Sequence, residues 1–202
     1  MATGSTLTSK GEATRARILE AATAEFAEHG IAGARVDRIA AEAQTNKAQL
    51  YAYFGSKERL FDTVFEASLE RIMDVVPIDA DDLADWAVRL YDEYVSRPDL
   101  IRLATWHRLE RRPTGHLLPD SDRMDETKLR SIAGAQEAGA IASDADPFDV
   151  MAMVIAMSMA WSPVSNVYSA SAAEPDDVHE QRRAFLRETV RRAFSTPVRS
   201  KS

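Results

Sequence analysis

Apolar residues recur at intervals of three and four positions along most of the chain, which is the period of an amphipathic helix. Alternating runs of β-branched and aromatic residues, the pattern typical of strands, are absent. Glycine, proline and short polar clusters separate nine segments with the helical period: residues 14–29, 36–43, 47–54, 57–75, 80–96, 98–111, 121–138, 147–162 and 176–194. The pattern therefore predicts an all-α protein.

Two of these segments are short and close together, which is the arrangement of a helix-turn-helix. Residues 36–43 and 47–54 are separated by Gln44, Thr45 and Asn46. Asn46 is expected to cap the second helix, because its side-chain oxygen can accept a hydrogen bond from a backbone N–H of the first turn. In a helix-turn-helix the second helix enters the major groove of DNA and the first crosses the backbone. The spacing predicts such a unit, although two ordinary amphipathic helices give the same pattern.

The second short helix has two chemically different sides. Leu50 faces the expected core, whereas Lys47, Gln49, Tyr51 and Tyr53 face outward. Lysine pairs with phosphate or guanine, glutamine can pair with adenine, and tyrosine donates a hydrogen bond to phosphate. The outward side chains are therefore candidates for contact with duplex DNA.

Residues 14–65 resemble the N-terminal region of the TetR family of transcriptional regulators. The resemblance is carried by Phe26-Ala27-Glu28-His29-Gly30, Val36…Ile39-Ala40, Lys47…Leu50-Tyr51…Tyr53-Phe54 and Ser56-Lys57-Glu58…Leu60. It implies an N-terminal three-helix DNA-binding domain over residues 14–56 and a larger helical domain over 57–195 that binds a ligand and forms a homodimer. Residues 57–75 are then the connecting helix. The implied function is a ligand-responsive repressor that binds a palindromic operator as a dimer.

The resemblance also implies which residues contact DNA. Lys47 and Gln49 lie where family members reach base edges, and Tyr51 lies where they touch phosphate or a thymine methyl group. Tyr53 and Lys57 are placed to bond phosphate. The full set of expected contact residues is Arg35, Val36, Lys47, Ala48, Gln49, Tyr51, Tyr53 and Lys57. For Tyr51 the alternative is partial burial against the core of the domain.

Two residues depart from the family's pattern. Arg35 stands before the first short helix, where relatives carry serine or threonine, so a side-chain cap worth about 0.5–2 kcal/mol is missing. We expect Arg35 to meet a phosphate instead. Gln44 stands at a turn position that is usually glycine, and it is therefore expected to adopt a left-handed backbone conformation. Neither change removes a residue that faces the groove.

The C-terminal part carries no comparably specific pattern. Residues 147–162 are apolar nearly all round and hold four of the seven methionines, which favours a helix buried on several sides. That segment and residues 176–194 are expected to form the dimer interface. The residues expected to line an effector cavity are Trp86, Tyr94, Trp106, Met157 and Trp161, and those expected in the interface are Met153, Phe185 and Val190. Each of them is also consistent with an ordinary core position.

The charge of the chain is unevenly divided. The net charge is −7, but the first 62 residues hold eight basic and eight acidic side chains, so the whole negative excess lies beyond them. Together with the methionines and tryptophans, this excess favours a flat, lipophilic, cationic effector. Carboxylates such as Asp92, Glu93 or Glu110, or the ring faces of Trp86 and Trp106, are the candidate anchors. The alternative is that these acids are simply solvated and the rings simply core.

Other classes of protein find little support in the sequence. No cysteine is present, the four histidines lack metal-ligand spacing, and no phosphate-binding loop or nucleophile elbow occurs. We therefore expect no cofactor and no metal; a helical protein-interaction module and an enzyme are the alternatives. No apolar run is long enough to cross a membrane and no secretory signal begins the chain, which favours a cytoplasmic location. Residues 1–13 are expected to form a disordered arm and 196–202 a frayed tail.

Overall fold

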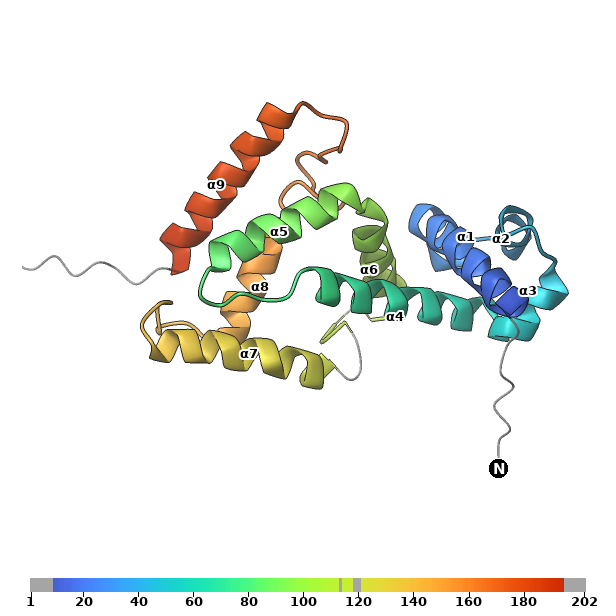
Figure 1. Ribbon diagram of the computed structural model, residues 1–202, viewed down its shortest axis with the longest axis horizontal. Coiled ribbons are helices and arrows are strands. Elements are labelled where there is room, and N and C mark those ends of the chain that lie inside the picture. The colour runs from blue at the N-terminus through green and yellow to red at the C-terminus, as the bar shows by residue number, and fades with distance from the viewer. Residues whose placement is uncertain (1–8, 113, 118–120, 195–202) are drawn as a thin grey trace, which may run out of the picture. The chain divides into compact units, whose positions relative to one another are not determined.

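The computed structural model describes residues 9–112, 114–117 and 121–194, which form helices and no strand (Figure 1). The nine helices of this described part are α1 (Ser9–Gly33), α2 (Val36–Glu42), α3 (Lys47–Phe54), α4 (Lys57–Val75), α5 (Leu83–Ser96), α6 (Pro98–Glu110), α7 (Ser121–Glu137), α8 (Pro147–Ser158) and α9 (Asp176–Phe194). The prediction of an all-α protein is confirmed.

The first helix differs from its prediction at both ends. It begins at Ser9, so the expected disordered arm is wrong for residues 9–13. Gly30 was expected to end the helix, but α1 kinks there, with φ 69° and ψ −179°, and continues to Gly33. Residues 1–8 and the expected tail over 196–202 lie outside the described part of the chain.

The chain forms two compact units. The first comprises residues 1–71 and 102–114, and the second comprises 72–101 and 115–202. This division differs from the boundary expected at residue 57, because most of α4 and most of α6 belong to the first unit.

The first unit is built on one apolar cluster. Ile18 and Phe26 of α1, Ile39 of α2, Leu50 of α3 and Phe61 of α4 are fully buried. The rings of Phe26 and Phe61 pack edge to face with centroids 5.2 Å apart. Such packing fixes the two short helices against α1 and α4, because buried side chains of this size occupy defined positions.

Hydrogen bonds and backbone conformation near α3 agree with the turn and the helix starts that the sequence predicts. The Asn46 side chain accepts a hydrogen bond from Gln49 N at 2.8 Å and so caps α3. Gln44 has a φ of 51°, which confirms its left-handed conformation in the turn. Ser56 Oγ accepts from Arg59 N at 3.2 Å at the start of α4. The turn between α2 and α3 is therefore specified by its own residues.

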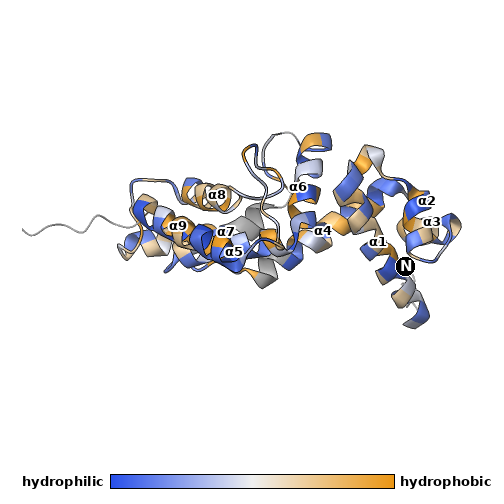
Figure 2. Cartoon of the chain, turned by 90° about the horizontal axis from the view of Figure 1, so that it is seen from above, coloured by the Kyte–Doolittle hydropathy of each residue, from blue (hydrophilic) through white to orange (hydrophobic). Residues whose placement is uncertain are grey.

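In the second unit α5 packs against α8 and α9, and α7 packs against α8 (Figure 1). Hydrophilic and hydrophobic residues alternate along α5, α7 and α9, so each of these presents a polar and an apolar side, whereas α8 is apolar over most of its length (Figure 2). The apolar sides form a core that includes Trp86, Tyr91, Val150, Val154 and Leu186.

Val190 also belongs to this core. Its side chain is only 1% exposed. The sequence placed Val190 in the dimer interface, and its burial within its own unit corrects that position.

Candidate nucleic-acid interface and effector cavities

The outward side of α3 carries the predicted DNA-contact residues. Leu50 and Phe54 are buried, so the remaining side chains of this helix face away from the core. Lys47, Ala48 and Gln49 are exposed, as is Tyr51, whereas Tyr53 is half-buried. Just before α2, Arg35 is exposed, and Val36, the first residue of that helix, is half-buried. One side of a short helix thus presents a cation, an amide and two phenols, the groups suited to DNA contact.

Two of these side chains are held by neighbours in the turn region. Lys47 Nζ lies 2.6 Å from Asp37 Oδ1, and this hydrogen bond raises the pKa of the lysine. The Thr45 hydroxyl donates to Gln49 Oε1 at 2.6 Å. The bond to Thr45 leaves the Gln49 amide nitrogen available as a donor, and Lys47 must leave Asp37 before it pairs with DNA.

Lys57 has a different environment from that expected of a phosphate contact. Its ammonium group lies 3.4 Å from Ala32 O and 3.2 Å from Ala34 O, at the C-terminal end of α1. Free carbonyls at a helix end carry partial negative charge, so a lysine there stabilises the helix terminus. In the free protein Lys57 therefore joins the start of α4 to the end of α1.

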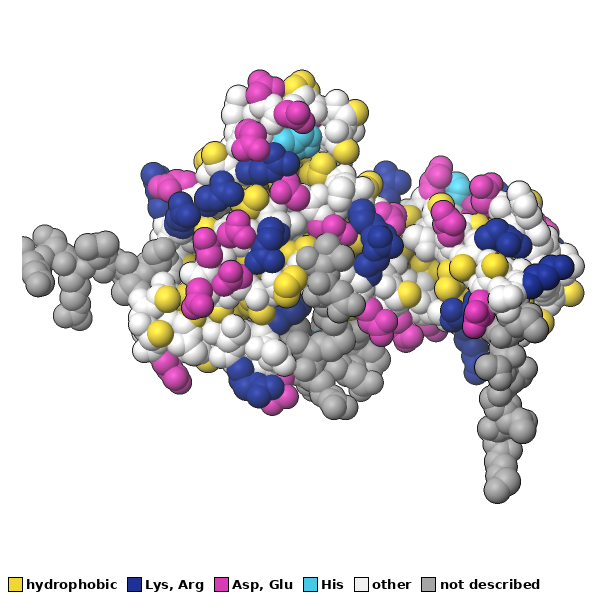
Figure 3. Space-filling model, in the orientation of Figure 1, with side chains coloured by type: hydrophobic (Ala, Val, Ile, Leu, Met, Phe, Trp, Pro, Cys, Tyr) yellow, Lys and Arg dark blue, Asp and Glu magenta, His cyan; other side chains and the backbone are white. Residues whose placement is uncertain are grey.

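The start of α2 lacks a side-chain cap, as expected from Arg35. Glu25 takes that role from α1, because its Oε1 accepts from Arg35 N at 2.7 Å. Burial pushes the pKa of Glu25 upward, but the Arg38 guanidinium and the Arg35 N–H more than offset this and hold the pKa below its usual value. The Arg35 guanidinium itself has no hydrogen bond or ion pair to the described residues, so it is free to meet a phosphate. On the face shown in Figure 3, acidic and basic side chains are interspersed.

The five residues expected to line an effector cavity do not lie together around a single cavity. Trp86 and Tyr94 lie in the core of the second unit, where burial raises the pKa of Tyr94. Met157 and Trp161 pack at the edge of that core. Trp106 belongs to the first unit, where its indole N–H donates to Ala27 O at 3.2 Å.

Two open cavities lie in the second unit instead. A cavity of about 490 Å³ lies between α5 and the start of α9, and its lining includes Arg89, Asp92, Glu93, His179 and Arg183. A smaller one of about 210 Å³ is lined by residues 80–84, by Ala140 and Ile141, and by the end of α9. None of the five aromatic and methionine residues predicted from the sequence lines either of these two.

The acidic candidates for holding a cation differ in their partners. Asp92 Oδ1 accepts from Arg183 Nε at 2.8 Å, which joins α5 to α9. Glu93 Oε1 is buried with no hydrogen-bond partner among the described residues, and Arg97 Nε lies 3.9 Å from it. Glu110 accepts from two backbone N–H groups of α1 and is thus engaged in the first unit. Of the three, Glu93 has the most unused hydrogen-bonding capacity.

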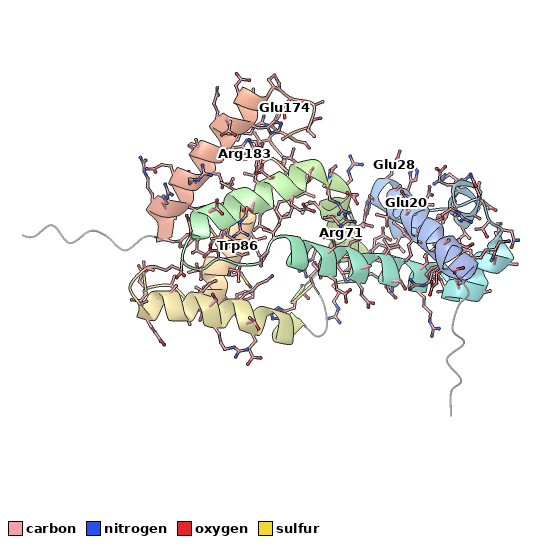
Figure 4. The ribbon with its side chains drawn as sticks, viewed as in Figure 1. Glu20, Glu28, Arg71, Trp86, Glu174 and Arg183 are labelled. Atoms are coloured by element: carbon pink, nitrogen blue, oxygen red, sulfur yellow. The ribbon has the colours of Figure 1, made fainter. Side chains whose placement is uncertain are left out.

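Sequence reasoning missed a polar cluster around the start of α9. Glu174 accepts from both terminal nitrogens of Arg182 at 2.8 and 2.9 Å, and Tyr168 OH donates to it at 2.7 Å. The guanidinium of Arg182 also lies 5.9 Å from the centre of the Trp161 ring. Glu174 lies in the loop before α9, and the cluster holds that loop on the helix (Figure 4). No short motif signals it, because its members meet only after the loop has folded back.

No helix in the described part of the chain combines the length and apolar character needed to cross a membrane. Among the same residues, no three His, Asp or Glu side chains are grouped so that they can hold a metal ion.

Comparison with known proteins accounts for both units. Residues 18–64 match the family described as bacterial regulatory proteins, tetR family, and residues 82–192 match the tetracyclin repressor-like C-terminal domain. The HTH-type transcriptional repressor SCO4008 of Streptomyces coelicolor is 43% identical over 155 residues, which cover 76% of this chain and 80% of the relative. The HTH-type transcriptional repressor NicS of Pseudomonas putida is 33% identical over 46% of this chain and 48% of its own length.

A solved structure extends the likeness to the whole fold. The crystal structure of the transcriptional regulator SCO4942 from Streptomyces coelicolor has a TM-score of 0.75 and 37% identity, and the match covers 91% of this chain and 99% of that one. The matched families and curated relatives are regulators of transcription and not enzymes. The helix-turn-helix, the helical second unit and these likenesses agree, and the chain belongs to the TetR family of transcriptional regulators.

Proposed function

We propose that this chain is a repressor that binds a pseudo-palindromic operator as a homodimer and releases it when a lipophilic cation binds its second unit. The outward side of α3 carries the proposal. Lys47, Gln49 and Tyr51 project from a helix whose start is fixed by the Asn46 cap and whose other side is buried. A short helix held in this way is suited to present side chains to the major groove.

Exposed apolar side chains support the dimer. Met153 on α8 is 50% exposed and Phe185 on α9 is 66% exposed, although both belong to helices whose other sides are buried. Large apolar surface left open on a monomer marks an interaction site. A dimer that binds a palindromic operator must present its two recognition helices about 34–36 Å apart or slightly more, the spacing of successive major grooves.

The cavity between α5 and α9 is the proposed effector site. Its volume of about 490 Å³ is within the range of small-molecule sites. A cationic ligand can supply the hydrogen-bond donor that Glu93 Oε1 lacks. Asp92 and Asp176 lie in the same lining and bring its carboxylates to three, while Val76 and Val95 supply apolar surface.

The experiment that tests operator binding starts with selection of bound duplexes from the source genome. On the selected operator, Gln49→Ala should relax base preference at one position in each half-site and cost about 1–3 kcal/mol of binding free energy there. The amide is the group lost, and Thr45 already occupies its oxygen in the free protein. Gel-shift titrations on a set of single-base operator variants measure the change. If no duplex is enriched, the proposed function fails.

Asp37→Asn is a control of opposite sign on the same face. The change removes the carboxylate that holds Lys47 and leaves a side chain of nearly the same size. Binding should strengthen, because one negative charge leaves the face that meets phosphate and Lys47 no longer exchanges one anion for another. Equal effects of the two substitutions on every base position would contradict a base-reading role for Gln49.

The effector is tested by titration of matched lipophilic cations and anions against the protein–operator complex. Cations should release the operator, and Glu93→Gln should weaken that release about tenfold while leaving operator affinity without effector unchanged. Fluorescence-detected operator release gives both values. Release by anions alone would show that the charge assignment is wrong, and release by cations that Glu93→Gln leaves intact would place the site elsewhere.

A further inference from the structure

The segment that joins α1 to α2 is short and strongly bent. After the kink at Gly30, α1 makes one more turn to Gly33, and only Ala34 and Arg35 precede α2. The kink leaves backbone N–H groups just beyond it without helical acceptors, because a helix provides none for its first N–H groups. The direction in which α2 and α3 leave α1 is set by this segment.

Helix α6 supplies the missing acceptors. Glu110 Oε1 accepts from Ile31 N and Glu110 Oε2 accepts from Ala32 N, both at 3.0 Å. The Trp106 indole N–H donates to Ala27 O, on the other side of the kink, at 3.2 Å. One carboxylate and one indole, a helical turn apart on α6, therefore hold the α1 backbone before and after its bend.

The fit at the kink is close. A β-carbon added at Gly30 would lie 2.7 Å from Glu110 Oε1 and 2.9 Å from two atoms of the Trp106 ring. Gly30 also has a φ of 69°, a conformation that residues with a β-carbon rarely adopt. Both the bend and the approach of α6 therefore depend on glycine here.

The residues that follow are held by other side chains. Lys57 lies on the carbonyl oxygens of Ala32 and Ala34, and Glu25 accepts from Arg35 N. The last turn of α1 and the start of α2 thus have their backbone polar groups bonded to side chains of α1, α4 and α6. Because bonded backbone groups resist displacement, these side chains favour one conformation of the segment.

We propose that Glu110 and Trp106 are positioning residues for operator binding, which hold the α1 kink so that α2 and α3 leave it in the direction that DNA requires. The inference rests on the proposed function, since it assigns these residues to the same interface. Neither side chain contacts DNA in this assignment. Loss of their hydrogen bonds lets the segment adopt other conformations, and apparent operator affinity falls with the fraction of molecules in the binding conformation.

The test is Glu110→Gln in the full-length protein. Glutamine has nearly the same size, but it has one accepting oxygen, and its NH₂ group faces an N–H donor of Ile31 or Ala32. Operator affinity should fall about tenfold, which corresponds to a binding conformation populated about one time in ten. Without DNA, hydrogen exchange at the Ile31 and Ala32 amides, measured by nuclear magnetic resonance, should accelerate, while exchange in α5 and α8 stays unchanged.

Glu66→Gln is the matched control, because Glu66 is an exposed acid of α4 with no hydrogen bond or ion pair to the described residues. It removes the same charge, so its effect on affinity measures simple electrostatics. Trp106→Phe keeps an aromatic ring but replaces the indole with a smaller one and removes the N–H bond to Ala27 O; it should weaken binding less than Glu110→Gln but in the same direction.

Three results separate the possibilities. Faster amide exchange with weaker binding in Glu110→Gln and Trp106→Phe, but not in Glu66→Gln, supports the positioning role. Unchanged exchange at Ile31 and Ala32, or equal affinities for Glu110→Gln and Glu66→Gln, overturns it. If the unmodified protein binds no duplex, the proposed function has failed, and the exchange rates still decide whether Glu110 holds the segment.

Discussion

Replacement of Phe185 by aspartate is expected to convert the protein from a dimer into monomers and to weaken operator binding by about two orders of magnitude. The phenyl ring is 66% exposed and projects from α9, whose opposite side is buried through Leu186. A carboxylate in the centre of an apolar interface loses its hydration without gaining a partner, and this cost opposes association. A monomer holds one half-site only, and the loss of the second removes an avidity of about 10²–10⁴.

Leu109→Asp is the matched control for this prediction. Leu109 is also 66% exposed, but it lies on α6 in the first unit and not on either helix proposed to form the interface. Analytical ultracentrifugation should find monomers for Phe185→Asp and dimers for Leu109→Asp at the same concentration. A dimer that survives Phe185→Asp would place the interface on another surface, and a wild-type monomer with tight operator binding would rule out the dimer itself.

The parts of the fold that sequence predicts well are those determined by neighbouring residues. The turn between α2 and α3 is one example, because Asn46 caps the next helix and Gln44 adopts the left-handed conformation without help from distant parts of the chain. The exposure of Lys47, Gln49 and Tyr51 follows in the same way from the helical period once Leu50 is buried. Local chemistry therefore carries most of the candidate DNA-binding surface.

Features set by distant residues escape such reasoning. Gly30 is a reasonable helix end by itself, and α1 continues past it because Glu110 bonds to Ile31 and Ala32 from 79 and 78 positions further along the chain. Likewise, the helical period places Val190 on an apolar face but does not tell which partner covers that face. Periodicity identifies an apolar side, and only the folded structure shows whether the same chain or a second copy packs on it.

For Trp86 the alternatives are a position in the core and a contact with the effector. If the ring belongs to the core, its replacement by alanine should destabilise the second unit by about 3–5 kcal/mol. The indole is 1% exposed in the core and its N–H faces Val76 O at a distance of 3.4 Å. Removal of so large a buried side chain leaves a cavity that its neighbours fill only in part, and Val76 O loses its donor. Urea unfolding followed by circular dichroism measures the loss of stability.

Trp161→Ala gives the comparison that separates a core ring from an effector contact. Trp161 is half-buried, with its ring packed edge to face against Tyr91 at 5.8 Å, so its removal costs less apolar burial and should destabilise the unit by a smaller amount. Trp86→Phe, which keeps most of the buried volume, should restore much of the stability and leave effector-driven release of the operator unchanged. If Trp86→Phe retains stability but abolishes release, Trp86 contacts the effector and the proposed cavity beside Glu93 is not the whole site. If Trp86→Ala leaves the unfolding free energy unchanged, the ring is not the core element that its burial indicates.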